Sequence, residues 1–191
     1  MEVILSLLIG ISLSATTGFR IFVPLFFLSI ASLAGWVELS PAFNWVGSYT
    51  ALTALTIAMV LETGAYFFPF IDNLLGTLSA PVSLIAGTLI TSSLMIDLPP
   101  ILTWTLAAVA GGGAALGGSA VSNVMHGAST SMTGGTANIF LSLAETIFSL
   151  IISVLAVLVP VLAFLLLVIF VFIMVGIFRR INSSRPRNKH A

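Results

Sequence analysis

A series of apolar segments, most of them long enough to cross a lipid bilayer, constrains the fold of this sequence more than any other feature. The segments cover residues 3–34, 48–68, 80–96, 101–125 and 139–178. A transmembrane helix needs about 20 apolar residues, whereas membrane barrels show alternating segments of about 10 residues. Hydrophobic residues make up 59% of the chain and charged residues only 6%. An ordinary soluble domain is about 25% charged, so we expect an all-α, polytopic helical membrane protein.

Two of the apolar segments are too long for one crossing. A single helix over residues 3–34 would be about 48 Å long, and its middle, Ser14 to Arg20, is polar and precedes Pro24. This pattern predicts a broken helix, or a crossing joined to a re-entrant piece. Residues 139–178 have room for two spans, with Pro160 between them. The total is about six transmembrane spans.

The region after residue 110 is rich in small residues. Gly113 and Gly117 form a GxxxG pair, which favours close helix approach in lipid. This pair would either pack spans within one chain or join two copies of it. Residues 119–138 are rich in Ser, Thr and Gly and almost free of charge. We expect non-regular backbone there, packed in protein or lining a cavity.

The turn sequence from Asp97 to Pro100 divides the chain into halves, 1–97 and 100–178, each with about three spans. In each half a Ser-Ala pair precedes a potential cation, and a Glu-Thr pair follows in the next span, at Glu62 and Glu145. Three spans per half would make the second half antiparallel to the first. This pattern is typical of the inverted 3+3 repeats of transporters.

The basic residues are concentrated at the C-terminus. Residues 1–178 are expected to form a single transmembrane domain, and 179–191 a basic tail that is flexible in solution. Positively charged segments remain on the cytoplasmic side. We therefore expect an integral protein of the bacterial or archaeal cytoplasmic membrane, with a cytoplasmic C-terminus and no nucleic-acid partner.

The motifs of common catalytic sites are missing. The sequence has no cysteine, and His126 has no second histidine at ligand spacing, so no metal is expected. The glycines of 111–118 lack the GK[ST] of a phosphate-binding loop, and no G-x-S-x-G occurs. We expect no cofactor and no enzymatic activity.

Three ionisable residues, Arg20, Glu62 and Glu145, are expected deep in the bilayer, and Asp72 nearer its surface. A charge at the bilayer centre costs roughly 2.5–3.5 kcal/mol on insertion scales. Two interpretations remain open. The groups pair with one another for structural reasons, or they line a path for a solute or proton.

The other polar candidates also have two interpretations. Asp72 and Asn73 follow Pro69 and form either a cation- or substrate-binding corner or a helix N-cap. His126 is either a polar core residue or part of the same path, with Asn123 and Asn138 nearby.

These residues also resemble a known family. The order Gly18-Phe19-Arg20, then Glu62 with Pro69 and Asp72, then His126-Gly127 is similar to DUF4126, a bacterial membrane family of unknown function, over residues 8 to 138. Two departures concern charge. Tyr66-Phe67 stands where the family often has Asp-Lys, and Ser129 and Thr133 stand where it often has basic residues. The resemblance implies a family and key positions, but no activity, and the departures argue against a basic, anion-handling site.

The favoured hypothesis is a transporter or channel for an ion or small solute, working as a homo-oligomer in the lipid bilayer. The candidate path residues are Arg20, Glu62, Asp72, Asn73, Asn123, His126 and Glu145. One alternative is a translocase for a phosphate-headed lipid, with Arg20 at the phosphate. The other is a structural membrane protein without a substrate.

Overall fold

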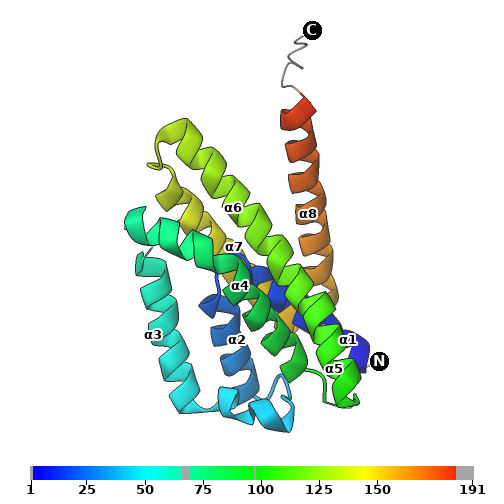
Figure 1. The fold of residues 1–191 in the computed structure, drawn as a ribbon. Coiled ribbons are helices and arrows are strands. Elements are labelled where there is room, and N and C mark those ends of the chain that lie inside the picture. Colours follow the sequence, from blue (N-terminus) through cyan, green and yellow to red (C-terminus); the bar gives the residue numbers. More distant parts are fainter. Residues whose placement is uncertain (1, 66–68, 97, 184–191) are drawn as a thin grey trace.

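The computed structural model describes residues 2–65, 69–96 and 98–183, with side chains at 3–65, 76–96 and 98–177. Every regular element in this part is a helix, which confirms the predicted all-α class (Figure 1). In chain order they are α1 (Glu2–Thr17), α2 (Phe22–Leu33), the 3-10 helix η1 (Pro41–Gly47), α3 (Tyr49–Ala65), α4 (Pro69–Ser93), α5 (Pro100–Leu106), the π-helical segment η2 (Ala107–Gly112), α6 (Gly113–Thr133), α7 (Asn138–Leu158) and α8 (Pro160–Ser183).

Several of these helices are long and apolar enough to cross a membrane. Within the described residues three qualify by length and composition: the continuous rod Pro100–Thr133, then Asn138–Leu158 and Pro160–Ile177. A fourth is added if η1 and α3, bent by 67°, count as one span. α7 has 21 residues, and at 1.5 Å per residue it matches the roughly 30 Å of the hydrocarbon core.

The distribution of polar and apolar side chains is the reverse of that in a soluble protein. On α7, Ser142 and Ser149 are buried, whereas Phe140, Ile147 and Ile151 are exposed. An exposed apolar surface on this scale requires an apolar solvent. The helices therefore bury polar side chains beside an apolar core and turn apolar faces outward, as expected for a membrane protein.

The short helix α1 lies at the centre of the bundle. It packs against α4, α6, α7 and α8, and every residue from 12 to 20 is buried. Its hydroxyl groups hold the neighbouring helices: Ser14 Oγ donates to the Gly87 carbonyl over 2.7 Å and lies 2.9 Å from Thr91 Oγ1. These bonds satisfy polar groups that neither lipid nor water can reach.

The C-terminal end of α1 crosses α6 with almost no space between the two backbones. A Cβ atom on Gly18 would overlap the backbone of Ala115 and Ser119, and one on Gly118 would overlap the carbonyl oxygen of Ala15. Only glycine permits this approach. The crossing sets the first break of the chain directly beside α6.

Two sequence predictions about helix ends are confirmed. α1 ends at Thr17 and α2 begins at Phe22, so the interruption falls within the polar stretch predicted from Ser14 to Arg20. α7 ends at Leu158 and α8 begins at Pro160, because proline suits the first turn of a helix and disrupts a helix interior. Of the turn predicted from Asp97 to Pro100, Asp97 lies outside the described residues, Leu98 and Pro99 lie between α4 and α5, and Pro100 begins α5.

Two predictions are wrong. Residues 119–138 are not irregular, because α6 continues to Thr133 and only a short turn precedes α7. The hydroxyl groups of Ser119, Ser131 and Thr133 donate to carbonyls four residues earlier on the same helix, so they do not disrupt it. The third span does not begin near residue 80, because α4 already begins at Pro69 and continues through Pro81.

The GxxxG pair does not pack helices together among the residues that the structure describes. A Cβ atom on Gly113 or Gly117 would meet nothing within 4 Å. Close contacts involve Gly111 and Gly112, which face α4, and Gly118, which faces α1. Of the two interpretations of the pair, contact with another copy stays a prediction.

The two ends of the bundle differ in composition. η1 and α5 lie at one end and the C-terminal end of α8, with Arg179 and Arg180, at the other (Figure 1). Trp45 of η1 and Trp104 of α5 are exposed. Exposed tryptophans in this position are typical of membrane proteins, which they anchor at the membrane surface.

The α1–α6 crossing leads to a stability prediction. Gly118→Ala should destabilise the protein by about 1–3 kcal/mol, because the new methyl group overlaps the Ala15 carbonyl. The matched control, Gly117→Ala, should leave the stability unchanged or raise it, since alanine favours helix and nothing lies nearby. Thermal unfolding in one detergent compares the two variants, and equal melting temperatures would contradict the prediction.

Candidate functional site

The break between α1 and α2 leaves two backbone N–H groups without a partner in their own helix. The backbone N–H of Arg20 donates to the Thr16 carbonyl over 3.0 Å, which closes α1. The N–H groups of Ile21 and Phe22 begin α2 and have no carbonyl of a preceding turn to bond. They are therefore available to an acceptor from another helix.

Glu62 of α3 supplies that acceptor. Its carboxylate receives the N–H of Ile21 at Oε1 over 2.7 Å and the N–H of Phe22 at Oε2 over 3.1 Å. The side chain is 7% exposed. The N-terminus of a helix carries a partial positive charge that stabilises a carboxylate. Glu62 thus caps α2 across the bundle and links α3 to the break.

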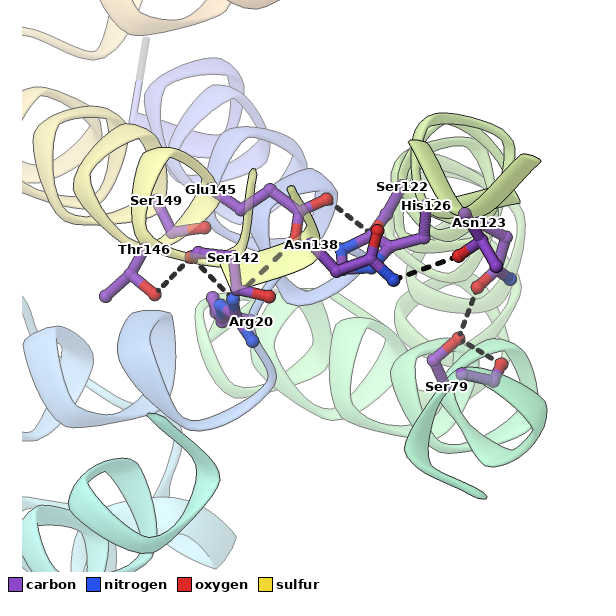
Figure 2. A network of polar contacts seen from close by, with 12 residues as sticks. Arg20, Ser79, Ser122, Asn123, His126, Asn138, Ser142, Glu145, Thr146 and Ser149 are labelled. Carbon is purple, nitrogen blue, oxygen red and sulfur yellow. Dashed lines mark hydrogen bonds and ion pairs between the residues drawn. The ribbon is translucent and has the colours of Figure 1, made fainter. Parts of the chain in front are cut away.

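Arg20 extends from the break to α7. Its guanidinium Nη2 donates to the Ser142 carbonyl over 2.5 Å and lies 3.7 Å from Glu145 Oε2 (Figure 2). The side chain is 1% exposed. This contact joins the two halves of the sequence through a buried ion pair, one of the two roles predicted for Arg20.

Glu145 also joins α7 to α6. Ser122 Oγ donates to Glu145 Oε1 over 2.6 Å, and His126 Nε2 lies 3.1 Å from Oε2 (Figure 2). Ser122 and His126 follow Gly118 at four-residue intervals and share its face of α6. The close α1–α6 crossing therefore also places the polar face of α6 over the break.

A polar cavity of about 360 Å³ lies against this cluster. It is bounded by the break, α4, α6 and the beginning of α7. Its lining residues include Phe19, Thr77, Ser79, Ser122, Asn123, His126, Gly127, Thr130 and Asn138. Asn123, Gly127 and Thr130 are exposed, so the cavity opens to the surface. The C-terminal half of α6 and the beginning of α7, which supply several of these lining residues, lie in the half of the bundle nearer the C-terminal end of α8 (Figure 1).

The cavity wall is held by hydrogen bonds and by aromatic packing. Asn138 Nδ2 donates to Thr130 Oγ1 over 3.0 Å, which ties the beginning of α7 to α6. Ser79 Oγ donates to the Gly76 carbonyl over 2.9 Å and lies 3.5 Å from Asn123 Oδ1. Phe19 packs edge-on against Phe148 and Phe170. Hydroxyl, amide and imidazole groups thus surround the cavity on a rigid frame.

The predicted site residues separate into three groups. Arg20, His126 and Glu145 lie in one cluster, with Asn123 on the adjoining cavity wall. Glu62 lies at the other side of the break as the cap of α2. Asp72 and Asn73 belong to α4, but their side chains lie outside the described residues. Whether these groups line a transport path stays a prediction.

Sequence reasoning missed Ser122, Ser142, Thr130 and Ser79. One of them had a detectable signal, since Ser122 precedes His126 by four residues, a spacing that places two side chains on one helix face. Ser142 contributes its backbone carbonyl to the Arg20 contact, and side-chain spacing does not reveal such a role. Among the described residues no cluster of three histidine, cysteine or acidic side chains could hold a metal ion.

The sequence profile of the family described as "Domain of unknown function (DUF4126)" matches residues 7–180. The chain belongs to the DUF4126 family. This match confirms the resemblance deduced from the Gly-Phe-Arg, Glu62 and His-Gly positions and extends it through α8. No curated protein and no solved structure matches the chain.

The capping contact leads to a second prediction for this DUF4126 protein. Glu62→Ala should destabilise it by about 1–3 kcal/mol, because buried backbone donors of α2 lose their acceptor. Glu62→Gln keeps one acceptor oxygen, so its stability should lie between that of Glu62→Ala and that of the wild type.

Melting temperatures in one detergent provide the measurement, with the exposed Glu38→Gln as a control that changes little. The capping role is excluded if Glu62→Ala unfolds at the same temperature as Glu62→Gln.

Proposed function

We propose that the chain is a transporter or channel that moves an ion or a small solute across the cytoplasmic membrane. One observation carries the proposal: a polar cavity in a membrane protein, whose wall residues Ser122 and His126 contact the buried carboxylate of Glu145. Intramembrane ionisable residues typically mark ion and solute paths. The proposal assigns no chemical reaction to the site.

A solute is favoured over a phosphate-headed lipid by the position of Arg20. The lipid alternative needs this guanidinium at the phosphate, yet Arg20 is 1% exposed and contacts the Ser142 carbonyl and Glu145. The third alternative, a structural protein without substrate, gives no role to a cavity lined by polar groups.

The orientation follows from the basic C-terminal segment. We propose that the end of α8 is cytoplasmic, by the positive-inside rule, and that the exposed Trp45 and Trp104 anchor the opposite end. The cavity then opens toward the cytoplasmic half of the membrane.

We also propose that five segments cross the membrane, one fewer than the six predicted from the sequence: α3, α4, the rod of α5 to α6, α7 and α8. α1 and α2 would form a re-entrant pair. This is supported by Gly10 of α1, which lies beside Thr91 near the end of α4, and by the N–H of Ser40, just after α2, which donates to the Ser93 carbonyl. Both ends of the pair therefore lie at the end of the bundle opposite the C-terminus (Figure 1). The unbroken α6 and the re-entrant pair both weaken the inverted 3+3 repeat, whose support is reduced to the positions of Glu62 and Glu145.

Transport through the cavity can be tested by filling it. Gly127 lies on the cavity wall, and a Cβ there would meet nothing within 4 Å. Gly127→Leu should therefore block the path while the helix remains intact, whereas Ala128→Leu, on the adjacent exposed position outside the lining, should not.

The measurement is the flux of sodium, potassium and ammonium salts, glycerol and urea into vesicles with purified protein, followed by light scattering and tracer uptake. The wild type and Ala128→Leu should exceed protein-free vesicles for at least one probe. A wild type no faster than empty vesicles, or a Gly127→Leu variant as fast as the wild type, would overturn the proposal. Accelerated flipping of a labelled phospholipid instead would favour the lipid alternative.

The homo-oligomer is proposed on the Gly113–Gly117 face, where a Cβ atom at either glycine would meet none of the described residues within 4 Å. Gly117→Leu should lower the mass of the detergent-solubilised particle by disrupting close approach between copies. Native mass spectrometry measures this mass. A wild-type particle with the mass of one chain would exclude the oligomer.

A further inference from the structure

The charges around the cavity identify the class of solute, if the proposed transport function holds. Between residues 3 and 178 the sequence has one basic residue, Arg20, and its acidic residues include Glu62, Asp72 and Glu145 within the helices. The site therefore has an excess of acidic groups. An anion would add to this excess, whereas a cation would reduce it.

The buried ionisable groups Arg20, Glu62 and Glu145 would carry a net negative charge with both carboxylates ionised and His126 neutral. Arg20 contributes one positive charge, and Glu62 and Glu145 contribute two negative charges when ionised, which leaves a net charge of −1. Uncompensated charge in a low-dielectric interior is costly. The dipole of α2 offsets part of the charge on Glu62, Arg20 pairs with Glu145, and a single additional positive charge close to this group would offset the remainder.

Two different positive charges can act on Glu145, which lies behind the wall residues Ser122 and His126. The first is a proton on the His126–Glu145 pair, whose atoms lie 3.1 Å apart. The second is a monovalent cation in the cavity. Hard cations prefer oxygen ligands, and the hydroxyl groups of Thr77, Ser79 and Thr130 and the amides of Asn123 and Asn138 all lie on the wall.

We propose that a proton on the His126–Glu145 pair and a monovalent cation in the cavity are alternative occupants of this site, so that the protein exchanges protons for a monovalent cation. Protonated His126 would repel a cation beside it. The two binding events therefore oppose each other, and the antagonism is reciprocal.

The charged and titratable groups around His126 also favour a cation over an anion in the cavity. Glu145 faces it from α7, Arg20 lies beyond Glu145 at the break, and Glu62 on α3 caps α2. Asp72 belongs to α4, four residues before Gly76 of the cavity wall, with its side chain outside the described residues. Any contribution from this carboxylate would add to the negative charge.

The experiment uses the full chain in vesicles of phosphatidylethanolamine and phosphatidylglycerol that contain a pH-sensitive dye. Sodium chloride or potassium chloride is added outside, and choline chloride serves as the control cation. Entry of sodium or potassium should expel protons and raise the internal pH, faster than in protein-free vesicles, whereas choline should not.

Variants assign the exchange to the site. Glu145→Gln should reduce the cation-driven pH change to the rate of protein-free vesicles, whereas the exposed Glu38→Gln should match the wild type. His126→Gln should make tracer uptake of the cation equal at about pH 6 and about pH 8, because this variant cannot take up a proton at the position. Uptake by the wild type and by His190→Gln should fall at the lower pH.

The outcomes separate this inference from the proposed function. If the internal pH responds equally to choline and to sodium or potassium, or if Glu145→Gln keeps the wild-type response, proton–cation exchange is excluded. The transport proposal would still stand in that case if the wild type moves glycerol or urea and Gly127→Leu blocks this flux. Because the choline comparison needs only the wild type, a variant that fails to fold does not prevent the test.

Discussion

The close crossing of α1 and α6 at Gly18 and Gly118 determines the positions of most other parts of the site. Two backbones meet there without side chains between them, so neither helix can shift without a clash. Because α1 ends at this point, Arg20 emerges beside α7, and the free N–H groups of α2 face α3. On α6 the same crossing directs Ser122 and His126, one and two turns later, toward Glu145.

The three buried charges are stabilised in different ways, and this distinguishes their roles. The Glu62 carboxylate accepts hydrogen bonds from two backbone N–H groups at the start of α2. Both bonds fix the position of α2. Glu145 instead contacts side chains, namely Arg20, Ser122 and His126, two of which lie on the cavity wall. A carboxylate held by side chains at a cavity can respond to what the cavity contains. In a bilayer, protein groups must replace the water that would otherwise solvate the Glu145 charge. The same contacts therefore stabilise the fold and form the candidate binding site.

Much of the helix pattern was predictable, because the bilayer imposes length and polarity on each segment. Proline at 160 and the polar stretch before Phe22 correctly predicted where helices end. The prediction failed at residues 119–138 for a specific reason. Serine and threonine were taken as signs of irregular backbone, yet in a helix their hydroxyl groups bond the carbonyl of the preceding turn and leave the helix intact. The early beginning of α4 at Pro69 was missed because proline was read only as a helix breaker, although it also suits a first turn.

The amino-acid sequence alone determined that this is a helical membrane protein of the DUF4126 family with rare ionisable residues in its apolar segments, since hydrophobicity and motif order are properties of the chain itself. It did not determine partners. Arg20 and Glu62 are closer in the sequence than Arg20 and Glu145, yet Arg20 pairs with Glu145, and Glu62 bonds backbone N–H groups. The tertiary structure decided this pairing, because contacts between helices depend on which faces meet at the glycine crossing, and no local pattern of residues encodes that meeting.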